Sequence, residues 1–230
     1  GSSVGNLYQV GLPVQIKKSV TKDLKLILKK RKIKSLNLKT TPNIMGILNI
    51  TPDSFSDGGK FHKSYLAKKY LNYLFDNGSD IVDIGGESTR PGSKGVSSKI
   101  EWDRIKYILK DINKKKVISL DTRKSDIMEK GIKLGVKLIN DVSGLNYDKK
   151  SIYILKKYQT SFVLQHSLGN PDRMQKNPKY KNVLLDIYDF FDEKIKFLRK
   201  IGIKHNNIIL DPGIGFGKNL KHNMKILKDI

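Results

Sequence analysis

Polar side chains that could bind a ligand or a metal ion follow directly after short apolar runs in this sequence. The runs are rich in Ile, Val and Leu, and the polar residues that close them are Asn49, Glu87, Asp121, Asn140, Asp141, His166 and Asp211. Carboxylate and amide groups pair the donors and acceptors of a polar ligand, and their oxygens also ligate hard cations such as Mg²⁺. These residues predict a polar site, provided that the fold brings them together.

Two further segments combine chemistry-bearing side chains with loop residues. "NITPDSFSDGG", from residue 49 to residue 59, delivers two carboxylates and three hydroxyls after an apolar run. "ESTRPGS", from residue 87 to residue 93, adds a carboxylate, an arginine and more hydroxyls. Pro and Gly beside Ser and Asp are typical of loops that become ordered when a substrate binds. We therefore expect both segments to be loops at the site.

The elements that position these residues follow from the hydrophobic pattern. Continuous apolar runs, typical of parallel strands buried on both faces, lie at residues 44–49, 80–86, 117–122, 137–144, 161–167 and 208–217. Helical patterns separate them near residues 64–78, 100–111, 125–133, 149–157 and 184–200, and another opens at about Leu220. Ser64 is the expected N-cap of the first helix, which should stop at Asn77-Gly78.

This alternation predicts an α/β fold made of βα units. Six units without a GxGxxG segment in the first favour a TIM (β/α)8 barrel, of which about six units are present, over a doubly wound sheet. In such a barrel the carboxyl ends of the strands form one rim, where the polar residues converge. We expect the barrel to occupy residues 43–230 and an accessory segment to occupy residues 1–42.

Composition restricts the classes of partner and compartment. The net charge is +23, but only six of the 45 basic residues are arginines and the lysines are spread along the chain. We therefore expect a solvated surface and no nucleic-acid partner. Zero cysteines fits a reducing, cytoplasmic compartment. No run approaches the roughly 18 apolar residues that a membrane span needs, so no membrane association is expected.

Five segments together resemble the motifs of the dihydropteroate synthase family, in order and spacing. They read "IMGILNITPDSFSDGGKF", "DIVDIGGESTRPGS", "SLDTRKS", "LINDVSG" and "LDPGIGFGKN". The resemblance implies a homodimeric, sulfonamide-targeted enzyme of folate biosynthesis. It transfers the dihydropterin-methyl group from 6-hydroxymethyl-7,8-dihydropterin diphosphate to 4-aminobenzoate.

The resemblance also implies roles for individual residues. The pterin is expected to bind at Asp121, Asn140 and Asp211, with Gly215 and Phe216 in the adjoining wall. A buried unpaired polar group costs about 1 to 3 kcal/mol, so a pterin edge needs such partners. Taken alone, Asp121 could be a helix cap, Asp211 part of a turn and Phe216 plain packing.

The same resemblance implies roles for the loop residues and a ligand for a metal ion. Asn49 is the expected ligand of Mg²⁺, which should arrive mostly with the diphosphate, and Thr89 is expected to bind that diphosphate. Asp53 should stabilise the cation left when diphosphate departs, and Phe55 should exclude water. Arg90 and Pro91 shape the aminobenzoate pocket, although Arg90 could instead form a structural ion pair.

The sequence departs from the family pattern in two places. Gln165-His166-Ser167 stands where the family often has Met-His-Met, so His166 is interpreted as a hydrogen-bonded rim histidine. The family's later Ser-Arg-Lys and Arg-x-His motifs do not occur before Ile230. We expect that the sequence is part of a longer chain. The alternatives left open are a pterin-binding methyltransferase barrel and a non-catalytic pterin-binding or nucleic-acid-binding protein.

Overall fold

The computed structural model describes residues 13–15, 18, 33, 36, 42–51, 60–88, 93, 95–168 and 178–229. The chain divides into two compact units, Gly1–Lys32 and Ile33–Ile230. The division falls between residues 32 and 33, whereas the sequence suggested a division between residues 42 and 43. The second unit contains all the elements discussed below.

Six parallel strands form one sheet in the order β1-β2-β3-β4-β5-β6. They are β1 (Met45–Asn49), β2 (Ile81–Gly85), β3 (Val117–Asp121), β4 (Leu138–Asp141), β5 (Ser161–Gln165) and β6 (Ile208–Asp211). Each strand pairs with the next strand in the chain. This sequential order confirms the predicted α/β class with six βα units.

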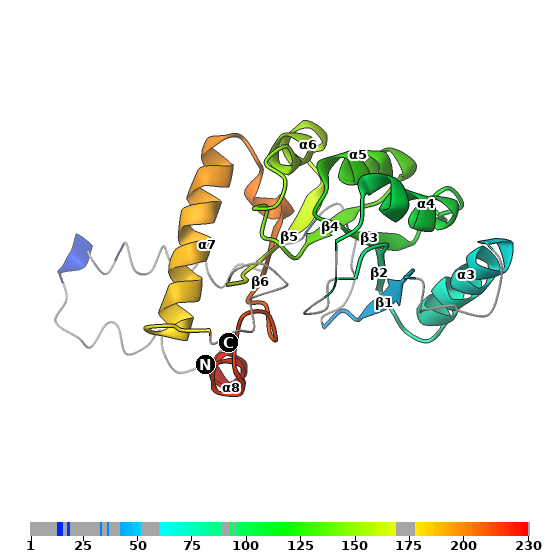
Figure 1. The fold of residues 1–230 in the computed structure, drawn as a ribbon. Coiled ribbons are helices and arrows are strands. Elements are labelled where there is room, and N and C mark those ends of the chain that lie inside the picture. Colours follow the sequence, from blue (N-terminus) through cyan, green and yellow to red (C-terminus); the bar gives the residue numbers. More distant parts are fainter. Residues whose placement is uncertain are drawn as a thin grey trace. The chain divides into compact units, whose positions relative to one another are not determined.

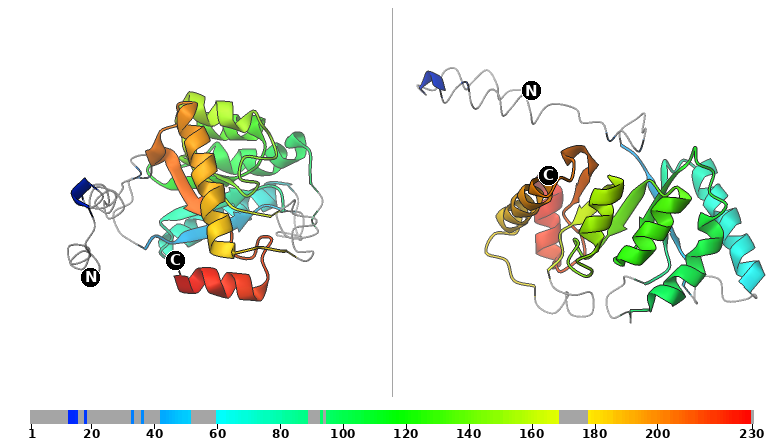
Figure 2. Two further views of the ribbon diagram at one scale, coloured as in Figure 1. Left: turned by 90° about the vertical axis from the view of Figure 1, so that its left-hand side faces the viewer. Right: turned by 90° about the horizontal axis from the view of Figure 1, so that it is seen from above.

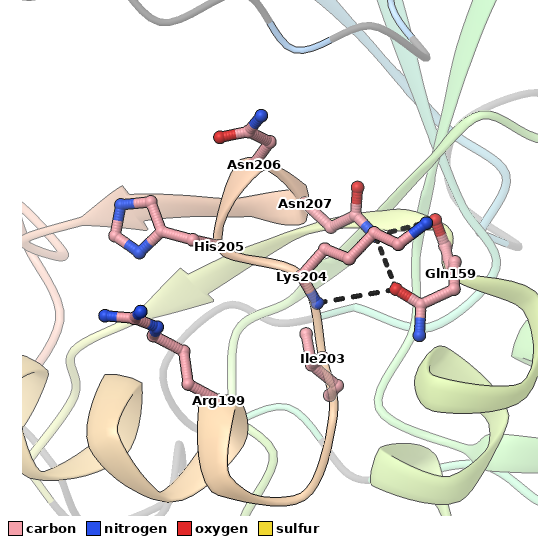
Figure 3. Close-up of a pocket in the computed structure, with 7 residues that line it drawn as sticks. All are labelled: Gln159, Arg199, Ile203, Lys204, His205, Asn206 and Asn207. Atoms are coloured by element: carbon pink, nitrogen blue, oxygen red, sulfur yellow. Dashed lines mark hydrogen bonds between the residues drawn. The ribbon is translucent and has the colours of Figure 1, made fainter.

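One helix follows each strand. The helices are α3 (Lys60–Asp76), α4 (Ser98–Leu109), α5 (Ser125–Leu134), α6 (Ser151–Tyr158), α7 (Val183–Lys200) and α8 (Leu220–Asp229). Helices α3 to α7 form an arc along one face of the curved sheet (Figure 1). α8 packs beside the beginning of α7, as both views in Figure 2 show. A 3-10 turn, η2 (His205–Asn207), precedes β6 (Figure 3). None of the helices in the described part of the chain is long and apolar enough to cross a membrane.

The predicted start of α3 is wrong. The helix begins at Lys60, so Ser64 lies inside it and does not cap it. No Pro or Gly stands between Lys60 and Ser64, and the chain can therefore be helical before it reaches the serine. The predicted end is confirmed, because the helix stops at Asp76 and Gly78 adopts a left-handed φ of 99°.

The four central strands, β2 to β5, are buried on both faces, as continuous apolar runs require, whereas the edge strands β1 and β6 are partly exposed. Toward the helices, alternate strand residues such as Val82, Ile118 and Phe162 form the larger core with residues of the helices. On the inner face a second core contains Ile81, Val117, Leu138 and Val163, and Leu36 packs into it from before β1. Ile81, Val117 and Leu138 are the first residues of their strands and Val163 is the middle residue of β5, so the inner face has an apolar floor below the carboxyl ends.

The larger core predicts a strong dependence on Phe162. This side chain is fully buried in β5, so Phe162→Ala should lower the free energy of unfolding by about 3 to 5 kcal/mol in urea titrations. Tyr153→Ala, at a side chain that is 71% exposed, is the matched control and should change it by less than about 1 kcal/mol. Similar losses in the two variants would show that the sheet and helices do not pack as described.

Candidate functional site

The polar residues predicted from the sequence meet on the inner face, at the carboxyl ends of the strands. In the strand register, Asn49 pairs with Gly85, Gly85 with Asp121, and Asp121 with Asn140. These four residues form one row across β1 to β4. Asp211 closes β6, where it pairs with Gln165 of β5. The inner face therefore changes from an apolar floor to a polar rim.

Gly85 lets two polar side chains approach each other across the row. A Cβ at this position would lie 3.1 Å from Oδ1 of Asn49 and 3.4 Å from Oδ2 of Asp121. Asn49 is exposed, and its side chain forms no hydrogen bond with another described residue. Its amide oxygen is therefore available to a cation, although one amide makes a weak site. The described ranges contain no group of three or more His, Cys, Asp or Glu residues that could hold a metal ion.

Asp121 is a carboxylate whose ionised form is unfavourable in its surroundings. Burial raises its pKa well above the usual value, and the negative charges of Asp83, Asp141, Glu101 and Glu87 raise it further. In the described part of the chain, no residue donates a hydrogen bond to Asp121. A ligand that presents N–H donors at this point would stabilise the ionised form.

Asn140 is oriented by a residue that the sequence analysis did not single out. Nδ2 of Asn140 donates to Oδ2 of Asp83 at 2.8 Å, which leaves Oδ1 of Asn140 as the acceptor for a ligand. Asp83 is 6% exposed, and burial raises its pKa while Ser119 and Asn140 oppose the rise. The spacing in the sequence could have identified Asp83, because it stands two residues before Gly85 and so faces the same side of the sheet.

Asp211 shapes the turn that follows β6. Its Oδ1 accepts a hydrogen bond from the Gly213 N–H at 2.7 Å, and its backbone carbonyl accepts from the His166 N–H at 2.9 Å. Gly213 and Gly215 have φ angles of 69° and 82°, a region that residues with a side chain rarely adopt. Gly215 and Phe216 lie in this turn, next to the end of β6.

A buried ion cluster lies where β2 and β3 end. Oε1 of Glu87 accepts from Nη2 of Arg123 at 3.0 Å, and Oε2 accepts from Nζ of Lys124 at 2.7 Å. Nζ of Lys124 also reaches Glu101 at 2.5 Å, so two cations balance two carboxylates. The N–H of Val96 donates to Glu87 at 2.9 Å. Glu87 thus ties the residues that follow "ESTRPGS" to the end of β2.

Other predicted site residues lie elsewhere or outside the described ranges. Asp141 closes β4 but belongs to the helix-facing side, where it accepts hydrogen bonds from the N–H and Oγ of Ser143. Burial raises the pKa of Asp141 to about 6. The predicted loop residues outside the described part of the chain are Asp53, Phe55, Thr89, Arg90 and Pro91.

Comparisons with known proteins identify the family. The model of the family described as pterin binding enzyme matches residues 45–230. The dihydropteroate synthase of Clostridium beijerinckii is 42% identical over 199 residues, which are 86% of this chain and 71% of that protein. The chain belongs to the dihydropteroate synthase family. Dihydropteroate synthases are transferases of folate biosynthesis, and this confirms the function class that the motifs implied.

Two solved dihydropteroate synthases have the same architecture. One, from Clostridium difficile in the presence of pteroic acid, has a TM-score of 0.74 at 41% identity and is matched over 81% of this chain and 69% of its own. The other, from Xanthomonas albilineans with 4-aminobenzoic acid, has a TM-score of 0.74 at 33% identity and is matched over 84% of this chain and 68% of its own. Dihydropteroate synthases are TIM barrels, which confirms the expected fold class.

The raised pKa of Asp121 predicts a stability that depends on pH. The folded protein holds a proton on Asp121 at pH values where the unfolded chain has lost it, so ionisation of this carboxyl destabilises the fold as the pH rises. Asp121→Asn should therefore unfold at a higher urea concentration than the parent at pH 7.5, with the difference shrinking toward pH 4. Asp189→Asn, at an exposed carboxylate on α7, should show no such difference. A less stable Asp121→Asn variant at pH 7.5 would contradict this electrostatic account.

The contact between Asp83 and Asn140 predicts an effect on ligand binding. Asp83→Asn leaves the Asn140 amide free to turn, so the affinity for a pterin measured by calorimetry should fall about tenfold. Asp80→Asn is the control, since Asp80 lies before β2 and bonds the Ile44 N–H at the opposite end of the strand. Unchanged pterin affinity in Asp83→Asn would show that packing alone orients Asn140.

Proposed function

We propose that this chain provides the pterin half of a dihydropteroate synthase site, on the inner rim formed by Asp121, Asn140 and Asp211. In the reaction, the C–O bond of the dihydropterin diphosphate breaks and diphosphate departs. The amine of 4-aminobenzoate then bonds to the methylene carbon and loses a proton. The observation that carries the proposal is the convergence of these three side chains on one polar rim in a chain of this family.

The three polar residues suit the edge of a pterin. Asp121 lacks donors among the described residues and is surrounded by negative charge, so the N–H groups of an aminopyrimidine would relieve it. Asn140 offers an acceptor whose direction Asp83 fixes. Asp211 uses one oxygen for the turn and keeps the other for the amino-pyrimidine edge. Gly215 and Phe216 form the adjoining wall of the pocket.

The diphosphate requires positive charge where the C–O bond breaks. We assign Asn49 as the protein ligand of a divalent metal, Mg²⁺, because its amide oxygen is exposed on the rim beside Gly85. The ion would neutralise charge on the leaving diphosphate. Thr89 is proposed to bind the diphosphate as well. Since Asn49 is a single ligand, the substrate must supply most of the remaining coordination.

The two loops supply the remaining roles by family resemblance. Asp53 is proposed to stabilise the pterin methylene cation, and Phe55 to keep water from competing with the amine. Arg90 and Pro91 are proposed to shape the aminobenzoate pocket. The neutral amine attacks without a strong general base, so the mechanism needs no paired carboxylates. The ion cluster at Glu87 supports this assignment, because it fixes Val96, three residues after the "ESTRPGS" segment, to the end of β2.

The setting of the enzyme is also part of the proposal. We propose a cytoplasmic homodimer that acts on these two small molecules and on neither nucleic acid nor membranes. A chain with no cysteine suits a reducing compartment. Light scattering after size-exclusion chromatography would test the dimer directly.

A coupled assay tests the function. The full-length gene product is supplied with the dihydropterin diphosphate, 4-aminobenzoate and Mg²⁺, and diphosphate release is measured with and without aminobenzoate. We expect release that depends on aminobenzoate and stops when the metal is chelated. A preparation that binds pterin but makes no aminobenzoate-dependent product would reject the proposed reaction.

Asp53 provides a sharper test within that assay. Asp53→Ala should lower kcat about 100-fold or more while the affinity for the pterin diphosphate changes less than threefold, because the carboxylate is needed only as charge develops. Asp57→Ala, in the same loop, is the matched control. Equal losses in turnover and in affinity would contradict the transition-state role of Asp53.

A further inference from the structure

Lys218 is a buried lysine in an unusual environment. Its side chain is 3% exposed and follows the turn after β6. Nζ lies 2.9 Å from the carbonyl oxygen of Phe216, 3.0 Å from that of Gly213 and 3.2 Å from that of His166. It also lies 3.0 Å from Nδ1 of His166. Four acceptors from two separate segments therefore surround one ammonium group.

The groups around the Lys218 ammonium are uncharged acceptors with dipoles rather than carboxylates. None of the carboxylates in the described ranges forms a salt bridge with it, and three of its four contacts are backbone carbonyls. An ammonium has three N–H donors, which matches an arrangement of converging acceptors, whereas an uncharged amine has only two. Burial lowers the pKa of Lys218 to about 8, and Asp211 opposes this change. The converging acceptors and this pKa together favour the ammonium form at neutral pH.

His166 completes the arrangement as an uncharged acceptor. Burial, followed by the charge of Lys218, lowers its pKa to about 4, while its own backbone and Asp186 oppose this change. The ring is 5% exposed and packs against Tyr180 and Phe190. A neutral ring that accepts through Nδ1 carries its hydrogen on Nε2. His222 packs against the ring of Tyr180, with the two ring centroids 4.8 Å apart.

The turn of residues 213–217 packs tightly against the residues that follow β5. A Cβ on Gly213 would lie 2.1 Å from the carbonyl oxygen of His166, and one on Gly217 would lie 2.8 Å from the backbone nitrogen of Leu168. Tyr180 donates to the carbonyl of Gly217 at 2.8 Å. Backbone carbonyls brought so close together repel one another unless a cation or donor lies among them. Lys218 occupies that position.

We propose that Lys218 is a positioning residue, whose buried ammonium holds the turn of residues 213–217 against the end of β5 and thereby sets the pocket wall formed by Gly215 and Phe216. This inference rests on the proposed function, because it assigns that wall to substrate. Lys218 itself is buried, and the proposed role requires no contact between its side chain and substrate. Arginine cannot replace it, since a planar fork does not match four acceptors converging on one point.

Substitution tests the role through substrate affinity. In the full-length protein, Lys218→Met should raise the KM for the dihydropterin diphosphate at least about tenfold and lower kcat by a smaller factor, since the wall moves but the reacting groups remain. Lys221→Met, at an exposed lysine three residues further along, should leave both constants within about twofold. Wild-type KM and kcat in a folded Lys218→Met variant would overturn the proposal.

Chemical rescue separates the ammonium from packing. Residues 1–230 contain no cysteine, so Lys218→Cys introduces a single thiol within them, and alkylation in denaturant with bromoethylamine followed by refolding restores a lysine-like side chain. The aminoethylated variant should regain the parent KM within about threefold, whereas the same variant alkylated with an uncharged ethyl group should not. Equal KM values for the two adducts would also overturn the proposal.

One spectroscopic measurement distinguishes this inference from the proposed function. NMR titration of His166 should show an Nε2–H tautomer and a pKa far below 6.5, and in Lys218→Met that pKa should rise. An unaltered protein without aminobenzoate-dependent turnover would reject the proposed function while leaving this titration valid. A His166 pKa near 6.5 in an active enzyme would reject the ammonium contact alone.

Discussion

The direction of the six strands is the constraint on which the rest of the structure depends. Because all of them are parallel, their carboxyl ends lie at one edge, and every residue that ends a strand is brought to the same rim. The amino ends then form the opposite edge, where the inner face is closed by apolar side chains. A polar site above an apolar floor follows from strand direction together with alternation of side chains.

Several carboxylates lie at or near the rim, and only some of them are paired with cationic side chains. Glu87 and Glu101 are neutralised by Arg123 and Lys124, so they act as structural ions. Asp121 has no such partner among the described residues. Its ionised form is therefore unfavourable in the free protein and would be stabilised by hydrogen-bond donors of a ligand. A chain with a net charge of +23 thus leaves selected carboxylates unpaired on its inner face. An unpaired carboxylate of this kind can bind the hydrogen-bond donors of a ligand.

Sequence patterns predicted the strands well because buried parallel strands need continuous apolar runs, and a run is visible locally. They could not separate Asn140 from Asp141, since neighbours in a strand point to opposite faces and only the register shows which is inside. Asp83 was hidden within an apolar run for the same reason. The contacts of Lys218 join segments about fifty residues apart, so no local pattern reveals them. The start of α3 was misjudged because a serine within a helix resembles a cap.

The apolar floor has a consequence for the order of folding. Leu36 is synthesised before all six strands of the sheet, yet it is buried among residues of β2, β3, β4 and β5, and Val163 lies more than 120 residues further along the chain. Closing so long a loop is slow compared with forming neighbouring βα units. During synthesis the burial of Leu36 is therefore complete only after β5 has been made. A residue near the start of this unit is thus among the last of this core to become fully buried.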